Sequence, residues 1–234
     1  YLSHSAVASG AKTTLVSGDD IKSFSKYDGS SDQKLDYTFN MAANTDWIAN
    51  WGENYSTYNS TTPGIGGVVT TTLFKYSGAY LHKSWNLKDK SDTATTNSVV
   101  VSYTEYDQTS DQKLLYTFNL KGNIKPTAVT GTGPDTRSLT INFTNNVANS
   151  TIFNYSGQYL QYSAVVDGQS TVINSGDVFR SLTKYDNTQD QRLLFTFNMK
   201  GGETFEGFDD SLYDVNEVAD STVFKYQGQY LSHS

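Results

Sequence analysis

Short runs that alternate large and small residues dominate this chain. Residues 97–107 (NSVVVSYTEYD) and 113–119 (KLLYTFN) alternate in this way, as half-buried β-strands do. The segment between them begins DQTS, and corresponding places in the chain read DGSS and DNTQ, compositions that favour tight polar turns. These segments predict a β-hairpin that ends on an aromatic-rich strand.

This hairpin belongs to a unit that occurs three times. Tyr-Leu pairs begin at positions 1, 80, 159 and 230, so successive pairs are 79, 79 and 71 residues apart. Tyr27, Tyr106 and Tyr185 each follow the tyrosine of their own pair by 26 residues, and a phenylalanine follows each of them by another 12. Two phrases that keep one register in three copies identify an internal repeat. We expect a single domain of three repeats, 1–79, 80–158 and 159–229, with a fourth partial copy at 230–234.

A second hairpin joins each repeat to the next. The segments FKYSGAYL, FNYSGQYL and FKYQGQYL place a Ser-Gly or Gln-Gly pair between two aromatic strands, which is a two-residue turn signal. Each repeat therefore contains four predicted strands, and the three repeats together contain twelve. The repeated parts show no helical period, so the predicted fold class is all-β.

Twelve strands in three copies, with a GxYL junction between copies and a TF pair on the third strand, resemble a β-trefoil. Fascin-type and fibroblast-growth-factor-type trefoils have a Gly-x-Tyr-Leu hairpin, and arabinose-binding trefoil modules have Tyr-Leu-x-His. Mussel galactose-binding lectins place a His-containing loop after the equivalent strand. The resemblance covers the FxYxGxYLxxS and DQxLxxTF segments, roughly a third of each repeat. It implies a three-fold β-trefoil that binds carbohydrate.

Each repeat is longer than an ordinary trefoil repeat because a segment of unrelated sequence follows the TFN phrase. These insertions are residues 41–73, 120–152 and 199–223. Within the second insertion, residues 138–146 (SLTINFTNN) alternate well enough to predict an added strand. If the insertions pair with one another, the fold is a different three-fold β-architecture, such as a β-prism.

Charge and composition argue against several classes of partner. The formal net charge of −7 is the opposite of the basic surface that nucleic-acid binding requires. No segment approaches the ~18 apolar residues of a membrane-spanning helix. The chain has no cysteine, so disulfides do not hold it together. Aromatic residues make up 14% of the chain, which distinguishes it from disordered sequences.

Five N-glycosylation sequons would accept glycans if the chain is secreted, which is the localisation that we expect. Their asparagines are Asn54, Asn59, Asn142, Asn149 and Asn154. A chain rich in Asn and Thr also produces such triplets by accident. The sequence shows neither an initiator methionine nor a signal peptide, so we expect a processed product or an excised piece.

The first candidate site is the position two residues after each Tyr-Leu leucine. It holds His4, Lys83, Tyr162 and His233. Polar side chains at a repeated strand end would line three equivalent shallow pockets, the arrangement that lectin trefoils use. The alternative is a solvated strand end that carries ordinary polar residues.

The second candidate set is the aspartate that follows each repeated tyrosine, namely Asp28, Asp107 and Asp186. A carboxylate that accepts hydrogen bonds from two sugar hydroxyls beside an aromatic ring is common in sugar-binding sites. The alternative is that these aspartates bond to backbone groups of the turn, as aspartate often does.

Three further features of the sequence bear on binding or catalysis. Trp85 follows YLHKS in a polar stretch and is predicted to be an exposed stacking platform, whereas Trp47 and Trp51 are expected to pack against the body. The acidic run 209–220 offers oxygen ligands for Ca²⁺, but its spacing is not that of an EF-hand, which favours a solvated loop. The chain has no cysteine nucleophile, no histidine spacing suited to zinc and no glycine-rich phosphate loop. We therefore expect no enzyme activity, no metal and no cofactor.

The sequence thus predicts a secreted, multivalent lectin that binds glycans through three equivalent sites. The alternative is a self-assembling extracellular structural or adhesive β-protein whose copies link head to tail through terminal strands. Residues 1–5 and 230–234 are both YLSHS, although a closed three-fold body has seats for only three Tyr-Leu strands. We expect one terminal copy to lie outside its own core and to contact a neighbour. A trefoil-type inhibitor or toxin component is a third interpretation.

Overall fold

The computed structural model describes residues 2–11, 13–16, 18–46, 67–88, 91–208, 210–213, 216–227 and 230–233. These residues are all-β, as predicted, with a short 3-10 helix at Asp210–Leu212. Within these ranges no helix has the length and apolar character needed to cross a membrane.

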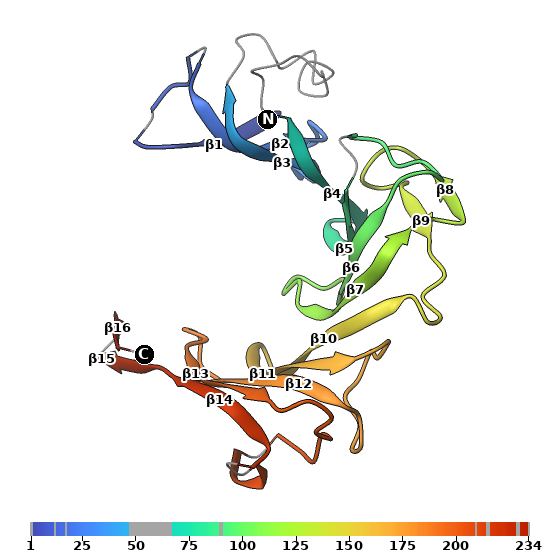
Figure 1. Ribbon diagram of the computed structural model, residues 1–234. Coiled ribbons are helices and arrows are strands. Elements are labelled where there is room, and N and C mark those ends of the chain that lie inside the picture. The colour runs from blue at the N-terminus through green and yellow to red at the C-terminus, as the bar shows by residue number, and fades with distance from the viewer. Residues whose placement is uncertain are drawn as a thin grey trace. The chain divides into compact units, whose positions relative to one another are not determined.

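Twelve strands form one antiparallel sheet in which the strands follow one another in chain order (Figure 1). Their bounds are β1 His4–Ala8, β2 Asp20–Tyr27, β3 Leu35–Asp46, β4 Val68–Ser77, β5 Tyr80–Leu87, β6 Val100–Tyr106, β7 Leu114–Ile124, β10 Val147–Ser156, β11 Tyr159–Asp167, β12 Phe179–Tyr185, β13 Leu193–Met199 and β14 Val218–Val223. Two separate strand pairs are β8 Ala128–Thr130 with β9 Ser138–Thr140, and β15 Lys225–Gln227 with β16 Tyr230–His233.

The sheet contains the predicted four-stranded repeat three times. The first repeat supplies β1 to β4, the second supplies β5, β6, β7 and β10, and the third supplies β11 to β14. In the third repeat the last strand is divided, because β14 ends at Val223 and β15 begins at Lys225. The fourth Tyr-Leu copy forms β16, which pairs with β15.

The chain separates into two compact units whose limits do not coincide with the repeats. Unit 1 comprises Tyr1–Tyr103, Asp107–Gln112 and Gly122–Asn142. Unit 2 comprises Thr104–Tyr106, Lys113–Lys121 and Phe143–Ser234.

Each repeat has one apolar face and one more polar face, here called the hydroxyl face, on which hydroxyl side chains pair across neighbouring strands. Residues directly opposite one another on paired strands lie on the same face. Phe24 is opposite Phe39 and both side chains are buried, whereas the neighbouring residues on the other face are serine and threonine. The hydroxyl pairs recur in every repeat, at Ser25–Thr38 (2.8 Å), Thr104–Thr117 (3.0 Å) and Thr183–Thr196 (3.1 Å).

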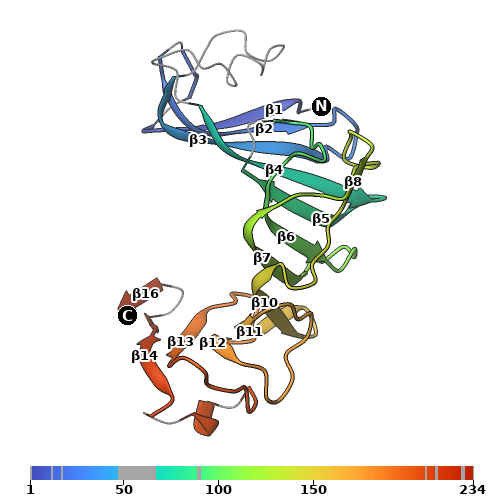
Figure 2. The same cartoon turned by 45° about the vertical axis from the view of Figure 1, so that its right-hand side comes forward.

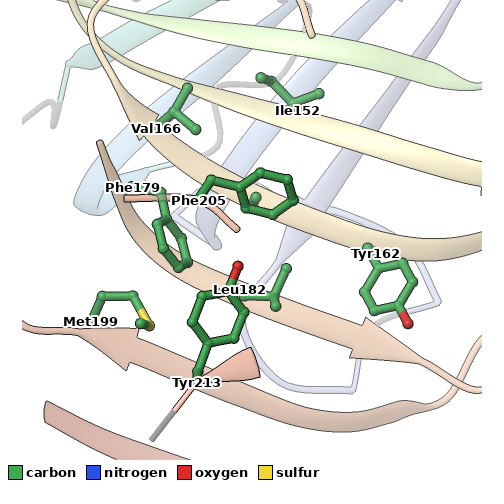
Figure 3. Packing of buried hydrophobic residues seen from close by; sticks show 9 residues of the cluster. Ile152, Tyr162, Val166, Phe179, Leu182, Met199, Phe205 and Tyr213 are labelled. Atoms are coloured by element: carbon green, nitrogen blue, oxygen red, sulfur yellow. The ribbon is translucent and has the colours of Figure 1, made fainter. Parts of the chain in front are cut away.

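Aromatic rings dominate the core of both units. In unit 1 the ring of Tyr37 lies 4.8 Å from that of Phe39. In unit 2 the ring of Phe179 lies 5.8 Å from Phe205 and 5.3 Å from Tyr213, and Figure 3 shows these rings packed among apolar side chains of the neighbouring strands. Packing of this kind, spread over many contacts, is the main source of stability for a sheet protein of this type.

The repeat predicts that the leucines of the Tyr-Leu pairs and the phenylalanines of the TFN and FxY phrases form a common core, and the structure divides these residues into two groups. Phe39, Phe118 and Leu160 are buried, and Phe197 packs against the core cluster of unit 2. The remaining positions depart from the prediction: Leu2 is 44% exposed, and Leu81, Phe74, Phe153 and Phe224 are only partly buried. The reason is the strand period of two. Since Leu73 points into the core, its neighbour Phe74 must point to the hydroxyl face.

The second insertion folds back onto the first repeat. The turn of its β8–β9 hairpin contacts the end of β4, because the N–H of Tyr76 donates to the backbone oxygen of Pro134 at 2.8 Å, and Figure 2 shows β8 crossing near the ends of β4 and β5. The predicted added strand over 138–146 is present as β9, but it ends at Thr140. Arg137, immediately before this strand, is 2% exposed, and its guanidinium donates to the backbone oxygens of Asp36 and Phe74, each at 2.9 Å. The insertion therefore acts as a clasp on strands β3 and β4.

Both terminal Tyr-Leu copies pair within their own chain. Residues of β16 pair with β15 in the same register that β5 uses on β4, with Tyr226 opposite Leu231 as Tyr76 is opposite Leu81. At the other end, the backbone N–H of Tyr27 donates to the oxygen of Ser3 at 2.9 Å. Each copy therefore has a partner strand in its own chain, and the C-terminal copy pairs in a separate two-stranded sheet outside the twelve-stranded one.

Candidate functional site

A basic side chain lies over a tyrosine ring at the same place in every repeat. We call these the cation–tyrosine sites 1, 2 and 3. The charged groups lie 5.6–6.0 Å from the ring centroids, within the range of a cation–π interaction. The pairs are Lys34 with Tyr76 (site 1), Lys113 with Tyr155 (site 2) and Arg192 with Tyr226 (site 3).

A repeated turn positions each basic residue. The turn starts at the aspartate of the YD phrase and ends on a glutamine with a positive φ, at Gln33 (50°), Gln112 (47°) and Gln191 (46°). This left-handed conformation is uncommon for a residue other than glycine. In all three copies the N–H of that glutamine donates to the backbone oxygen three residues earlier, which closes the turn. The basic residue comes next in the chain, so the turn fixes where its side chain begins.

The aspartates hold these turns together. Asp28 Oδ1 accepts hydrogen bonds from the N–H of Ser30 at 3.0 Å and of Lys34 at 3.1 Å. Asp186 Oδ1 accepts equivalent bonds from Thr188 and Arg192, both at 3.1 Å. Asp107 accepts from the N–H of Thr109 at 3.2 Å. Their carboxylates therefore bond to the turn that carries the basic residue of each site.

A β-bulge precedes each tyrosine of the sites. A bulge places an extra residue in one strand and can redirect the side chain that follows it. The strand register shifts between Lys75 and Tyr76, between Asn154 and Tyr155, and between Lys225 and Tyr226. The recurrence of this bulge at all three tyrosines explains why their rings reach the neighbouring turn.

Site 1 contains an ion pair between Lys34 and Asp135. The Nζ of Lys34 lies 2.8 and 2.9 Å from the two carboxylate oxygens of Asp135, a residue of the clasp. This hydrogen bond raises the pKa of Lys34, against the effect of burial. The hydroxyl of Tyr76 accepts a hydrogen bond from the N–H of Leu35 at 3.1 Å. An open hollow of about 630 Å³ is lined by these side chains together with His82.

Site 3 has the same plan with different partners. Arg192 pairs with Asp190, and its Nε lies 4.0 Å from a carboxylate oxygen of Asp186. A hollow of about 410 Å³ is lined by Asp190, Gln191, Arg192, Leu193 and Tyr226. A guanidinium, a carboxylate and an aromatic ring therefore border one shallow surface depression.

Site 2 differs from sites 1 and 3 in the hydrogen bond that its lysine makes. The Nζ of Lys113 donates to the backbone oxygen of Gly157, in the hairpin that follows Tyr155, at 2.9 Å. A smaller, largely apolar hollow of about 330 Å³ lies nearby, lined in part by Leu115, Tyr116 and Phe153. The three sites thus share a cation and a ring and differ in what surrounds them.

The first predicted site, two residues after each Tyr-Leu leucine, is not a set of equivalent pockets. The ring of His4 stacks on that of Phe24 at 5.4 Å. Partial burial lowers the pKa of His4, and the nearby charge of Lys26 lowers it further. Lys83 lies over the ring of Tyr103 at 5.8 Å. Tyr162 is buried in the core of unit 2, and His233 is placed only by its backbone, opposite Lys225. The surroundings of His4, Lys83 and Tyr162 therefore differ from one another.

Trp85 is not the exposed platform that the sequence predicted. Its side chain is 1% exposed, and its ring lies 6.1 Å from that of Tyr103. Strand alternation explains this burial, because Trp85 is directly opposite the core residue Leu73. Trp47 and Trp51 lie outside the described residues.

The remaining candidates concern glycans and metals. Asn142 is exposed, Asn149 is partly buried with its side-chain oxygen 2.8 Å from Nδ2 of Asn119, and Asn154 is partly buried. Asn54 and Asn59 lie outside the described residues, as does part of the acidic run 209–220. Among the residues that the structure does describe, no group of three or more potential metal ligands occurs.

The residues of the cation–tyrosine sites were present in the phrases that identified the repeat. The basic residue follows DQ in every copy, as Lys34, Lys113 and Arg192. The tyrosine is the third residue of every FxY strand. What the sequence did not indicate is that these two phrases, more than 30 residues apart in the chain, meet at one edge of each repeat.

Comparison with known proteins does not add a family to this description. No protein-family model matches the chain, and no curated protein sequence is significantly similar to it.

The turn aspartates lead to a prediction on acid stability. Burial acts to raise the pKa of Asp186, but hydrogen bonds from Thr188 and Arg192 outweigh it and hold the pKa below its ordinary value. A depressed folded-state pKa gives stability that is present above the unfolded pKa of about 4 and is lost as the pH falls through the folded value. Urea unfolding of Asp186→Asn should therefore show a weaker loss of stability below pH ~4 than the parent chain. Equal slopes in the two proteins would contradict this role.

Proposed function

We propose that this chain is a multivalent carbohydrate-binding protein, a lectin, whose binding sites are the three cation–tyrosine sites. The observation that carries the proposal is their recurrence: the same turn, the same bulge and the same pairing of a cation with a ring occur in each repeat. A structural ion pair needs no such repetition, whereas a multivalent binder gains from it.

The chemistry of sites 1 and 3 suits a neutral sugar. An aromatic ring offers an apolar face to the C–H groups of a pyranose, while a basic group donates hydrogen bonds and a carboxylate accepts them. Asp135 in site 1 and Asp190 in site 3 stand beside the basic residue. Neighbouring sugar hydroxyls both donate and accept, so this pairing matches them. The net charge of −7 disfavours strongly acidic glycans.

We expect each shallow site to bind its sugar weakly and the three sites together to bind a glycan surface more tightly. When three sites on one chain engage a dense glycan surface, the second and third contacts are intramolecular and raise the avidity by about 10²–10⁴ without tight individual binding. The proposal includes an extracellular location, where glycan surfaces occur and where the exposed Asn142 would accept a glycan of its own. It includes no catalytic step.

For the fold, the β-trefoil remains our proposal for the arrangement of the three repeats, whose third junction joins β14 to β1 within one chain or between two copies. The four antiparallel strands in each repeat support it, as do the two-residue hairpins that join the repeats. Small-angle scattering of the chain would distinguish a closed trefoil from an open curved sheet, because the closed body has the smaller radius of gyration. An open profile would remove the trefoil while leaving the binding proposal in place.

The function is tested by counting sugars per chain. A glycan array identifies the ligand, and calorimetry with that sugar should give about three sites in the parent chain. The double variant Tyr155→Leu/Tyr226→Leu removes the ring from sites 2 and 3, so we expect one remaining site and the loss of agglutination. Tyr80→Leu removes a tyrosine that is 40% exposed and lies outside the sites, and it should keep all three. Absence of any glycan ligand, or unchanged stoichiometry in the double variant, would contradict the proposal.

A further inference from the structure

The first and last strands of the large sheet are equivalent to strands that pair with each other at the junctions between repeats. Strands β1 and β14 are the first and last of the twelve, so within the described residues each pairs with one neighbour in that sheet. Strand β1 occupies the place in its repeat that β5 and β11 occupy in theirs, and β14 occupies the place of β4 and β10. At the two internal junctions, strands of these two kinds pair with each other, β4 with β5 and β10 with β11.

The internal junctions give the register that such a pair would take. At the first junction Leu73 is opposite Trp85, and at the second Ile152 is opposite Ala164. The equivalent residues of the end strands are Val223 on β14 and Ala6 on β1. The pairing of a large residue with alanine in the second junction shows that this combination fits the sheet. By the same register, Thr222 would be opposite Val7.

Strand β16 pairs with β15 and does not extend along β14. It pairs with β15 through Tyr230, Leu231 and His233, the counterparts of Tyr80, Leu81 and Lys83 on β5. At the internal junctions the pairing then continues along β4 through residues 84–87. The counterparts of those four residues are 5–8 in β1. The stretch of β14 before β15 therefore corresponds to the stretch of β4 that pairs with residues 84–87.

Over residues 5–8 and 221–223, neither edge carries the features that usually prevent strand pairing. Proteins protect exposed edges with charged side chains, proline or very short strands. Residues 5–8 (SAVA) and 221–223 (STV) contain no charge and no proline. Val7 is 56% exposed and Val223 is 62% exposed. The stretch of each edge that would pair is thus uncharged and partly apolar, and the charged Asp220 of β14 lies before that stretch, where it accepts a hydrogen bond from Asn198.

We propose that β14 of one copy of this chain pairs antiparallel with β1 of a second copy, with Val223 opposite Ala6. The contact adds main-chain hydrogen bonds along an existing sheet, the mode known as β-augmentation. Since the two surfaces differ, the contact is heterologous and joins copies head to tail, in a ring or in an open filament. This association does not depend on carbohydrate binding.

The absence of cysteine from the chain permits a direct cross-linking test. Ala6→Cys and Val223→Cys are made in separate preparations, mixed and oxidised. Residues directly opposite in a sheet have Cβ atoms about 4.5–5.5 Å apart, close enough for a disulfide to form with small adjustments. We expect a disulfide-linked heterodimer on a non-reducing gel. Val7→Cys mixed with Val223→Cys is the matched control, because its side chain lies on the opposite face and should give at least ten-fold less product.

The double variant Ala6→Cys/Val223→Cys separates a second copy from the chain's own end. Disulfides between chains, in a yield that rises with protein concentration, support the proposal. A disulfide within single chains at all concentrations would show that β1 closes on its own β14 and would overturn it. Equal cross-linking by the Val7→Cys control, or no cross-link in any mixture, would also overturn it.

Discussion

Replacing Arg137 with methionine should lower the free energy of unfolding by about 3–5 kcal/mol, the cost of breaking a buried ion pair by removing one partner. The guanidinium bonds to the oxygens of Asp36, Phe74 and Thr132, and it lies 2.8 Å from a carboxylate oxygen of Asp36. Methionine fills similar space but donates no hydrogen bond. Three backbone oxygens and one carboxylate would then lose their donor, and the clasp would detach from strands β3 and β4.

The expected loss depends on pH. Burial raises the pKa of Asp36, and the charge and hydrogen bonds of Arg137 oppose that rise. Without Arg137 this carboxyl can avoid a buried charge by taking up a proton, so the variant should recover part of its stability as the pH is lowered toward 5.

Urea unfolding at pH 7 and pH 5 measures both effects. Arg180→Met is the control, because that arginine is 60% exposed and pairs with Asp167 at the surface. Exposed pairs contribute about 1 kcal/mol or less, so the control should remain close to the parent chain. A small loss for Arg137→Met would show that the clasp does not stabilise unit 1.

The second large effect is expected from Phe39→Ala, which should cost about 3–5 kcal/mol, as large-to-small changes in a packed core do. Phe39 is 1% exposed, and its ring contacts Tyr37 and Phe24. Phe74→Ala in the same repeat is the matched comparison. Its ring lies on the hydroxyl face and is only partly buried, so it should cost less than half as much.

Thermal and urea unfolding of the two variants would place each phenylalanine relative to the core. Equal losses would mean that both faces of the sheet are buried, as they are in a sheet covered by a second layer. Such a result would contradict the assignment of an apolar face and a hydroxyl face to each repeat.

The sequence was sufficient for the repeat, the four strands in each copy and the two hairpins. These features depend on local patterns, namely alternation over a few residues and turn chemistry between them. It was not sufficient where two apolar residues are adjacent. Leu73 and Phe74 fit either phase of a strand, and only the pairing of β4 with its neighbours decides which one is buried.

Trp85 is a second residue whose burial the local sequence did not predict. Its neighbours in sequence are polar, and this predicted an exposed ring. The residue directly across the strand pair, Leu73, places the ring in the core instead. The ion pair of site 1 could not be predicted from a local pattern, because Lys34 and Asp135 are 101 positions apart and no repeated phrase contains Asp135.

The clasp also has a consequence for biosynthesis. Arg137 and Asp36 are separated by 101 residues. The ribosome therefore makes strand β3, which contains Asp36, well before it makes the arginine that pairs with this carboxylate. At a synthesis rate of about 5–20 residues per second, the first repeat waits on the order of 5–20 s for its clasp. During that interval Asp36 can remain hydrated at the surface of a nascent sheet. The first repeat therefore cannot reach its final stability until most of the second has been translated.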